Sequence, residues 1–373
     1  MVKPLKLVKH MLNEKQIVDR IRVILPDLLK NVNPDEINNV INEYSISSDL
    51  KADLVYNVGL GKKKNWKIIV AVKSVGQPRF IRMAAYQLKS FLADKQYYYG
   101  IIAAPYISEE SKKICLENNV GFVDLSGNCL IQFENIYISI EGRQNSFPDT
   151  RPLKMVFSAK SSRAIRLLLC NPRKLWYVKE LSEEAGISIG QVSKLKERLF
   201  EKEFIQETTG QQRKKFYIDK PVELLSEWGK VYRYRFNRVQ DYFSLEDTKT
   251  IENNLAEYCD KKNIAYAFTM TSGANLIAPY LRYNQVFCYV KGPLNELVEN
   301  LKLKSVTSGA NVSILTPFDD GVFDCMQNID GKNVVSDIQL YLDLKQYKKR
   351  GEEAAEFILN ERIKPRWEQN QNI

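Results

Sequence analysis

Two signals in close succession constrain the fold of this chain more than any other feature of its sequence. Gly186 ends a run of apolar residues spaced three or four apart, and glycine in that position favours the left-handed backbone that closes a helix. Ser188 follows, with Gln191 three residues later, and this pair is typical of the first turn of a new helix. The sequence therefore predicts two helices joined by a tight turn.

Three amphipathic segments and a hairpin surround this turn. Apolar residues recur every three or four positions in three segments, which predict helices at residues 161–171, 177–186 and 188–202. Two strand-like runs on either side of a polar, basic tip predict a hairpin over residues 204–218. Three helices followed by such a hairpin indicate a winged helix-turn-helix domain over residues 152–240, including a connecting helix, and duplex DNA is the usual ligand of such domains.

The third helix and the hairpin tip contain the residues expected to meet DNA. Polar side chains early in the third helix would reach base edges in the major groove, and basic side chains would contact phosphates. The tip would lie beside the backbone or the minor groove. The expected DNA contacts are Ser188, Gln191, Ser193, Lys194, Lys196, Arg198, Arg213, Lys214 and Lys215. A three-helix module that binds only protein, with a solvated basic face, remains an alternative.

The charge of the chain is concentrated in this segment. The net charge is +10, and residues 151–220 hold 16 Lys and Arg against eight Asp and Glu. Such a local excess is typical of a surface that binds a polyanion. Double-stranded DNA is therefore the expected partner.

Composition argues against several other classes of protein. No apolar stretch approaches the length that crosses a bilayer, and we expect no membrane partner. The six cysteines contain no CxxC pair, and His10 is the only histidine. Neither a zinc site nor a Ser-His-Asp triad is expected from such residues, so we expect no metal site and reduced thiols in a cytoplasmic protein.

A separate α/β domain is expected over residues 1–146, before a polar segment with two prolines at 143–152. Residues 1–44 have helical spacing, interrupted at Pro26. From residue 52 onwards, alternating and β-branched runs give the order β–β–α–β–α–β. This order favours an α/β sandwich.

Asp53 and Lys73 lie on the two strands of the first predicted hairpin. In this respect the domain resembles the PD-(D/E)XK restriction-endonuclease-like superfamily, in which an Asp and an (Asp/Glu)-x-Lys hold Mg²⁺. Ala71 stands where the second acid is required, while Glu43 and Gln87 match accessory positions. The resemblance therefore implies a degenerate nuclease fold without a cofactor, and Mg²⁺ is expected only if cleavage survives.

The C-terminal residues 241–373 alternate helical and strand-like runs and predict an α+β domain, so the whole chain is expected to be an α/β multidomain protein. Asp319 and Asp320 stand beside a proline and are interpreted as turn residues. Asp337, Tyr341 and Asp343 are interpreted as polar and structural positions of an amphipathic helix.

Several segments between residues 152 and 363 resemble the AbiEi-type antitoxins of type IV toxin–antitoxin systems. They are FSAKSSRAIRLLL, VKELSEEAGISIGQVSKLKERL, AFTMTSGANLIAPY and VVSDIQLYLDLKQYKKRGEEAAEFIL. The resemblance implies a transcriptional regulator that represses its own operon, with a nucleotidyltransferase toxin encoded nearby and no direct binding required. The chain departs from the short antitoxins by its N-terminal domain, which leaves a stand-alone regulator open.

Two other functions stay open at this point. One is a Mg²⁺-dependent endonuclease of the PD-(D/E)XK type in which the winged helix recognises the target. The other is an interaction protein whose C-terminal domain neutralises a partner enzyme.

Overall fold

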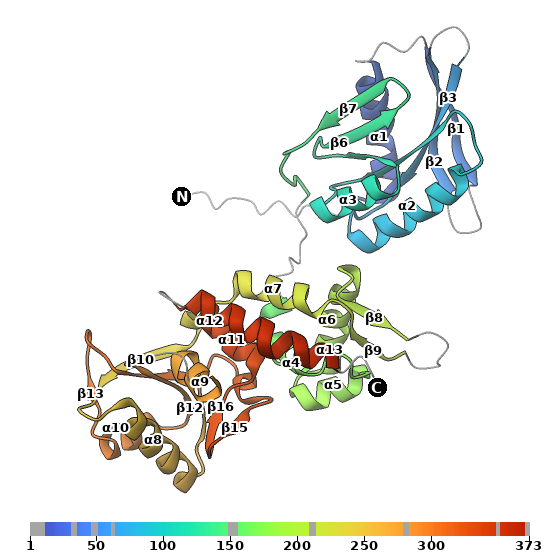
Figure 1. The fold of residues 1–373 in the computed structure, drawn as a ribbon. Helices are drawn as coiled ribbons and strands as arrows, with labels where there is room; N and C mark the ends of the chain where they lie inside the picture. The colour runs from blue at the N-terminus through green and yellow to red at the C-terminus, as the bar shows by residue number, and fades with distance from the viewer. Residues whose placement is uncertain are drawn as a thin grey trace, which may run out of the picture. The chain divides into compact units, whose positions relative to one another are not determined.

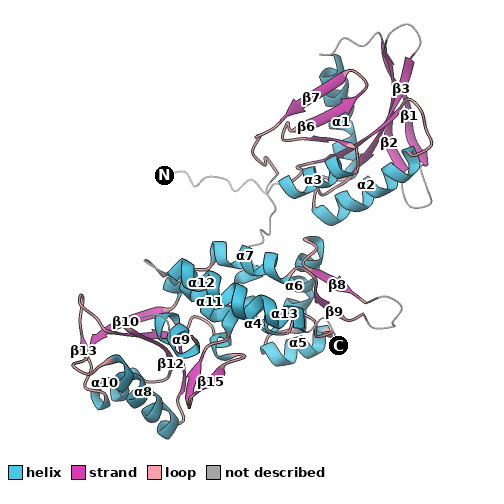
Figure 2. Ribbon diagram, in the orientation of Figure 1, coloured by secondary structure: helices cyan, strands magenta, loops and turns pink. Residues whose placement is uncertain are grey.

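A computed structural model describes most of the chain, and it divides into two compact units, Met1–Arg151 and Pro152–Ile373 (Figures 1 and 2). The described residues are 12–30, 36–45, 51–60, 64–147, 156–208, 214–278, 283–347 and 351–369. The division falls within the polar, proline-containing segment. Residues 152–240 and 241–373, expected as two domains, belong to the same compact unit.

The first unit is a seven-stranded sheet in which the strands follow chain order from β1 to β7. Its strands are β1 (Glu36–Ser45), β2 (Lys51–Leu60), β3 (Lys64–Val72), β4 (Tyr98–Ala104), β5 (Gly121–Asp124), β6 (Cys129–Phe133) and β7 (Ile136–Ile140). β3, β4 and β5 are parallel, and the other neighbouring pairs are antiparallel. The parallel connections pass through α2 (Pro78–Leu92) and α3 (Glu109–Glu117).

Helices cover both faces of this sheet. Ile17 and Ile21 of α1 (Glu14–Lys30) pack on one face, and Ile81 of α2 packs on the other. Successive strand residues point to opposite faces, so both sets of apolar side chains in β2 and β3 are buried. This explains the near-continuous apolar run in β3.

The helix expected over residues 1–44 is wrong for its last part, because residues 36–45 form strand β1. β1 pairs antiparallel with β2, from Glu36 opposite Gly59 to Ser45 opposite Lys51. The register shifts between Asn39 and Ile41, where a β-bulge interrupts the alternation of the strand. An interrupted alternation leaves apolar residues three or four apart, and that spacing imitates a helix.

The second unit begins with the predicted helices, turn and hairpin. They are α4 (Ala159–Cys170), α5 (Val178–Ala185), α6 (Ile189–Glu201), β8 (Ile205–Glu207) and β9 (Phe216–Ile218). Gly186 ends α5 with φ +62°, so the predicted left-handed cap is confirmed. Val192, Leu195 and Leu199 are buried, which confirms the predicted inner face of α6.

A second seven-stranded sheet follows, in the order β13-β10-β14-β12-β11-β16-β15. Its strands are β10 (Arg238–Phe243), β11 (Ala265–Phe268), β12 (Val286–Lys291), β13 (Lys304–Ser305), β14 (Val312–Thr316), β15 (Gln327–Ile329) and β16 (Lys332–Val334). The helices of this part are α7 (Pro221–Val231), α8 (Thr248–Lys262), α9 (Met270–Ile277), α10 (Leu294–Asn300), α11 (Asp337–Lys345), α12 (Gly351–Ile358) and α13 (Lys364–Gln369). α8 and α10 pack on one face of the sheet, and α9 and α11 pack on the other.

One hydrophobic cluster joins the helices of residues 152–240 to the C-terminal sheet, and this explains why the expected boundary near 240 separates no compact units. Trp367 of α13 donates its indole N–H to the Leu169 carbonyl of α4 at 2.9 Å. α11 is buried on all its faces, so the expectation of an amphipathic helix there is wrong. Its polar residues have buried partners instead of solvent.

Candidate nucleic-acid interface

The start of α6 is fixed by its own side chains. Ser188 accepts a hydrogen bond from the Gln191 backbone N–H at 3.3 Å, and the Gln191 side-chain Oε1 accepts from the Ser188 N–H at 3.2 Å. The predicted capping box is therefore confirmed. Because this bond engages the Gln191 amide oxygen, a contact from that oxygen to a base would have to compete with the cap.

The outer face of α6 is open in its first two turns. Ile189 is 53% exposed, although it is apolar, and Ser193 and Lys194 are exposed as well. A side chain added at Gly190 would meet no atom within 4 Å. The first turn contains no acidic residue. This end of the helix offers a small, uncharged or basic surface that another molecule can approach closely.

Further along α6, basic side chains hold carboxylates. Lys196 Nζ lies 2.6 Å from Glu207 of β8 and 5.5 Å from the centre of the Phe216 ring. Arg198 pairs with Glu201 at 3.1 Å. The Lys196 and Arg198 side chains are only about one-fifth exposed, at 19% and 21%. Lys196 thus braces α6 against the hairpin, whereas Arg198 pairs within α6.

Two of the three basic residues expected at the hairpin, Lys214 and Lys215, lie among the described residues. Lys214 is 62% exposed and lies 3.3 Å from Glu207, whose pKa is lowered mainly by its hydrogen bond from Lys196. Lys215 lies over the Tyr177 ring, 5.0 Å from its centre. Arg213, at the expected tip, lies outside the described residues.

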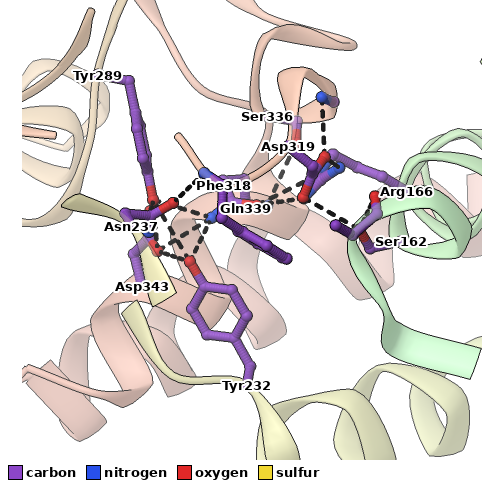
Figure 3. A network of polar contacts seen from close by, with 12 residues as sticks. Ser162, Arg166, Tyr232, Asn237, Tyr289, Phe318, Asp319, Ser336, Gln339 and Asp343 are labelled. Atoms are coloured by element: carbon purple, nitrogen blue, oxygen red, sulfur yellow. Dashed lines mark hydrogen bonds and ion pairs between the residues drawn. The ribbon is translucent and has the colours of Figure 1, made fainter. Parts of the chain in front are cut away.

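A buried polar network behind the helices was missed by the sequence analysis (Figure 3). Arg166 of α4 is fully buried, and its Nη1 lies 3.1 Å from Asp319 Oδ1. Its Nε and Nη2 donate to Gln339 Oε1 of α11 at 3.2 and 2.9 Å. Asp319 accepts from the Gly321 N–H, as a turn residue does, but its ion pair is with a residue 153 positions away.

The network continues from Gln339 into the C-terminal sheet. Gln339 Nε2 donates to Asp343 Oδ1 at 3.0 Å and to the Tyr232 hydroxyl at 2.9 Å. Tyr232 and Thr269 each donate to Asp343 at 2.6 Å. Burial raises the pKa of Asp343, against the opposing effect of these hydrogen bonds. The side chains thus connect α4, α7 and α11 through fully buried contacts.

The residues of the nuclease-like pattern are partly brought together in the first unit. Asp53 of β2 is half-buried, and its Oδ2 accepts from the Val72 N–H at 2.6 Å, one residue before Lys73. Ala71 is fully buried, and Gln87 lies partly exposed on α2. Glu43 lies on β1, and its side chain is outside the described part. Among the described residues no three His, Cys, Asp or Glu side chains form a group that could hold a metal ion.

A family of known proteins matches the C-terminal part of the second unit. Residues 217–364 match the family described as transcriptional regulators, AbiEi antitoxins of type IV toxin–antitoxin systems. The match runs from β9 to the first residue of α13 and covers less than half of the chain. It contains Tyr232, Gln339 and Asp343, whereas α4, α5 and α6 lie before it.

No curated protein and no solved structure matches the chain significantly. Among the described residues no helix is long and apolar enough to span a membrane.

Proposed function

We propose that this chain is a sequence-specific DNA-binding regulator that represses its own operon through a winged helix-turn-helix over residues 156–218. Two independent observations support the proposal. The C-terminal part matches a family of transcriptional regulators. The segment before it has three helices, a left-handed turn and a hairpin in the order of that DNA-binding fold.

The observation that carries the proposal is the open first half of α6. A recognition helix must bring its N-terminal side chains against base edges, which requires exposed positions without negative charge. Ile189, Gly190, Ser193 and Lys194 meet this requirement. We assign base contacts to Ile189, Gly190 and Ser193, and to Gln191 only where the cap opens, while Ser188 keeps its cap.

Basic residues divide into two groups in this proposal. Lys194, Lys214 and Lys215 contact phosphates, together with Arg213. Lys196 holds α6 to the hairpin through Glu207, and Arg198 pairs with Glu201 within α6, so each reaches a phosphate only by giving up its carboxylate. A phosphate that draws Lys214 away from Glu207 replaces one anion by another, so this exchange costs little.

Antitoxin function is part of the proposal because of the family match. The toxin would be a nucleotidyltransferase encoded next to this chain. A toxin of a type IV system need not touch its antitoxin, so the proposal requires DNA binding and leaves direct association out.

Fluorescence anisotropy on a duplex from the chain's own promoter tests DNA binding. We expect affinity to fall with salt by about 0.9 log units per log unit for each phosphate neutralised. Lys194→Gln should weaken binding and reduce this slope by about one. Lys249→Gln is the charge-matched control. Lys249 is an exposed lysine on α8, which packs on the face of the C-terminal sheet opposite α11. Equal effects of the two variants, or no binding by the wild type, would contradict the proposal.

For the first unit we propose a degenerate PD-(D/E)XK-like module that does not cut DNA. The order α1, three antiparallel strands, α2 and a parallel β4 supports the resemblance. Asp53 of β2 accepts from the Val72 N–H at the end of β3, one residue before Lys73, but Ala71 is buried and apolar. One carboxylate leaves Mg²⁺ held mainly by water, so the endonuclease alternative lacks a ligand.

A further inference from the structure

The connection between α7 and β10 carries a cluster of positive charge that the proposed interface does not use. Residues 232–238 read YRYRFNR and contain three arginines, Arg233, Arg235 and Arg238. The segment begins where α7 ends and passes through the short turn Tyr234–Phe236 (η2). We call it the arginine turn.

The buried network anchors the arginine turn at both ends (Figure 3). Tyr232 is 1% exposed and donates to Asp343 at 2.6 Å. Asn237 is 4% exposed; it donates to the Tyr289 hydroxyl at 3.1 Å and accepts from the Phe318 N–H at 3.0 Å. Buried side-chain bonds on both sides therefore fix the backbone between these two residues.

The residues between and beside the anchors point outward. Arg233, Arg235 and Arg238 are exposed, and among the described residues none of them forms an ion pair with a carboxylate. Arg233 Nη1 donates to the Lys230 and Tyr232 carbonyls, which holds its guanidinium at the end of α7. Phe236 is 56% exposed and rests on the Phe318 ring, 5.9 Å between centres.

This arrangement concentrates positive charge on the surface. Three exposed guanidinium groups lie within six residues, and no carboxylate among the described residues pairs with them. A rigid backbone also means that little ordering is required when a ligand binds. Guanidinium groups on such a frame suit phosphates, which they can bind with two parallel hydrogen bonds.

We propose that the arginine turn is a second DNA-contact surface that binds phosphates flanking the site read by α6. The inference rests on the proposed DNA-binding function. It is favoured over an acidic protein partner because α6 in the same compact unit leaves phosphate sites to be filled elsewhere, since its Lys196 and Arg198 are engaged with carboxylates. Phosphate contacts supplied by the same compact unit outside that region add affinity without reading sequence.

The double variant Arg235→Gln with Arg238→Gln tests the inference. Both side chains are exposed and outside the buried network, so the melting temperature should stay unchanged. Lys249→Gln with Lys304→Gln removes the same charge from other exposed positions and is the matched control. The probes are two labelled duplexes from the chain's own promoter, one ending at the protected site and one extended at both ends.

On the extended duplex, the arginine variant should reduce the salt slope by up to about two and lower affinity at low salt by more than the control. On the short duplex, the difference between the two variants should shrink, because the flanking phosphates are missing. Preference for the cognate sequence should not change on either probe.

Three outcomes would overturn the inference. The arginine variant can change affinity and salt slope by as much as the control does, which would show that only net charge matters. It can behave as wild type on both duplexes, as expected if the arginine turn binds a protein. Its loss of affinity can be equal on the short and extended probes, which would exclude contact with phosphates that flank the site. If Lys194→Gln still weakens binding in these cases, the proposed function survives and only the arginine turn is wrong; if the wild type binds no duplex, both fall.

Discussion

Replacing Arg166 by methionine is the perturbation that most directly probes how the second unit is held together. The guanidinium is fully buried, pairs with Asp319 and donates two bonds to Gln339. Methionine fills similar volume but leaves the Asp319 side chain, 3% exposed, without its counter-charge. Removing one partner of a buried ion pair costs about 3–5 kcal/mol, and we expect the free energy of unfolding to fall by that amount.

Urea unfolding followed by tryptophan fluorescence measures this change, since the Trp228 ring lies 5.3 Å from the Arg166 guanidinium. Asp319→Leu should destabilise by a similar amount because it leaves the arginine uncompensated. The double variant Arg166→Met with Asp319→Leu leaves no buried charge from this pair. Its loss of stability should therefore be clearly smaller than the sum of the two single losses.

The two single variants and the double variant also test whether residues on either side of position 240 unfold together. Arg166 lies on α4, and Asp319 lies just before the short 3-10 turn Asp320–Phe323 in the C-terminal part. Each single variant should shift one common transition. Two separate transitions, additive losses, or a cost of less than about 1 kcal/mol, as for an exposed salt bridge, would refute the reasoning.

Three further predictions concern single sites. Of the six cysteines, five are buried and Cys325 is half-buried. The hydrogen bond from Cys170 lowers the pKa of the Cys325 thiol. Iodoacetamide at neutral pH should therefore modify one thiol rapidly, and Cys325→Ser should abolish that reaction. Several rapidly modified thiols would contradict the burial pattern. Plasmid DNA incubated with the chain and Mg²⁺ or Mn²⁺ should show no nicking above a Lys73→Ala control, whereas metal-dependent cleavage abolished by Asp53→Ala would bring the endonuclease function back. Exposed Ile189 should pack against a thymine methyl group of the operator. Replacing that thymine by uracil should lower the affinity of the wild type and leave the affinity of Ile189→Ala unchanged, as binding assays on paired probes can show.

The local structure from α4 to β9 could be predicted from sequence because its signals lie within a few residues of one another. Gly186, Ser188 and Gln191 determine where one helix ends and the next begins, and their geometry agrees with the prediction. The buried positions of α6 followed from its spacing. The sequence did not show which basic side chains of α6 already have a partner, because the fold of the hairpin brings Glu207 to Lys196.

Long-range features could not be predicted. Arg166 and Asp319 are separated by 153 positions, and nothing local distinguishes this arginine from Arg163 and Arg173, which are not buried. The polar residues of α11 were interpreted as a solvent face, whereas Gln339 and Asp343 find their partners in α4, at the end of α7 and in β12. β1 was missed for a different reason, since its bulge disrupts the alternation by which strands are recognised.

Repression of the chain's own promoter can be measured with a reporter fusion in cells that supply the chain from a second plasmid. We expect wild-type chain to lower reporter output, and Ser193→Ala with Lys194→Gln to restore it at equal protein level. Lys249→Gln, the matched surface change, should repress as the wild type does. Repression that persists in the α6 variant, or no repression by the wild-type chain, would contradict the proposed DNA-binding function.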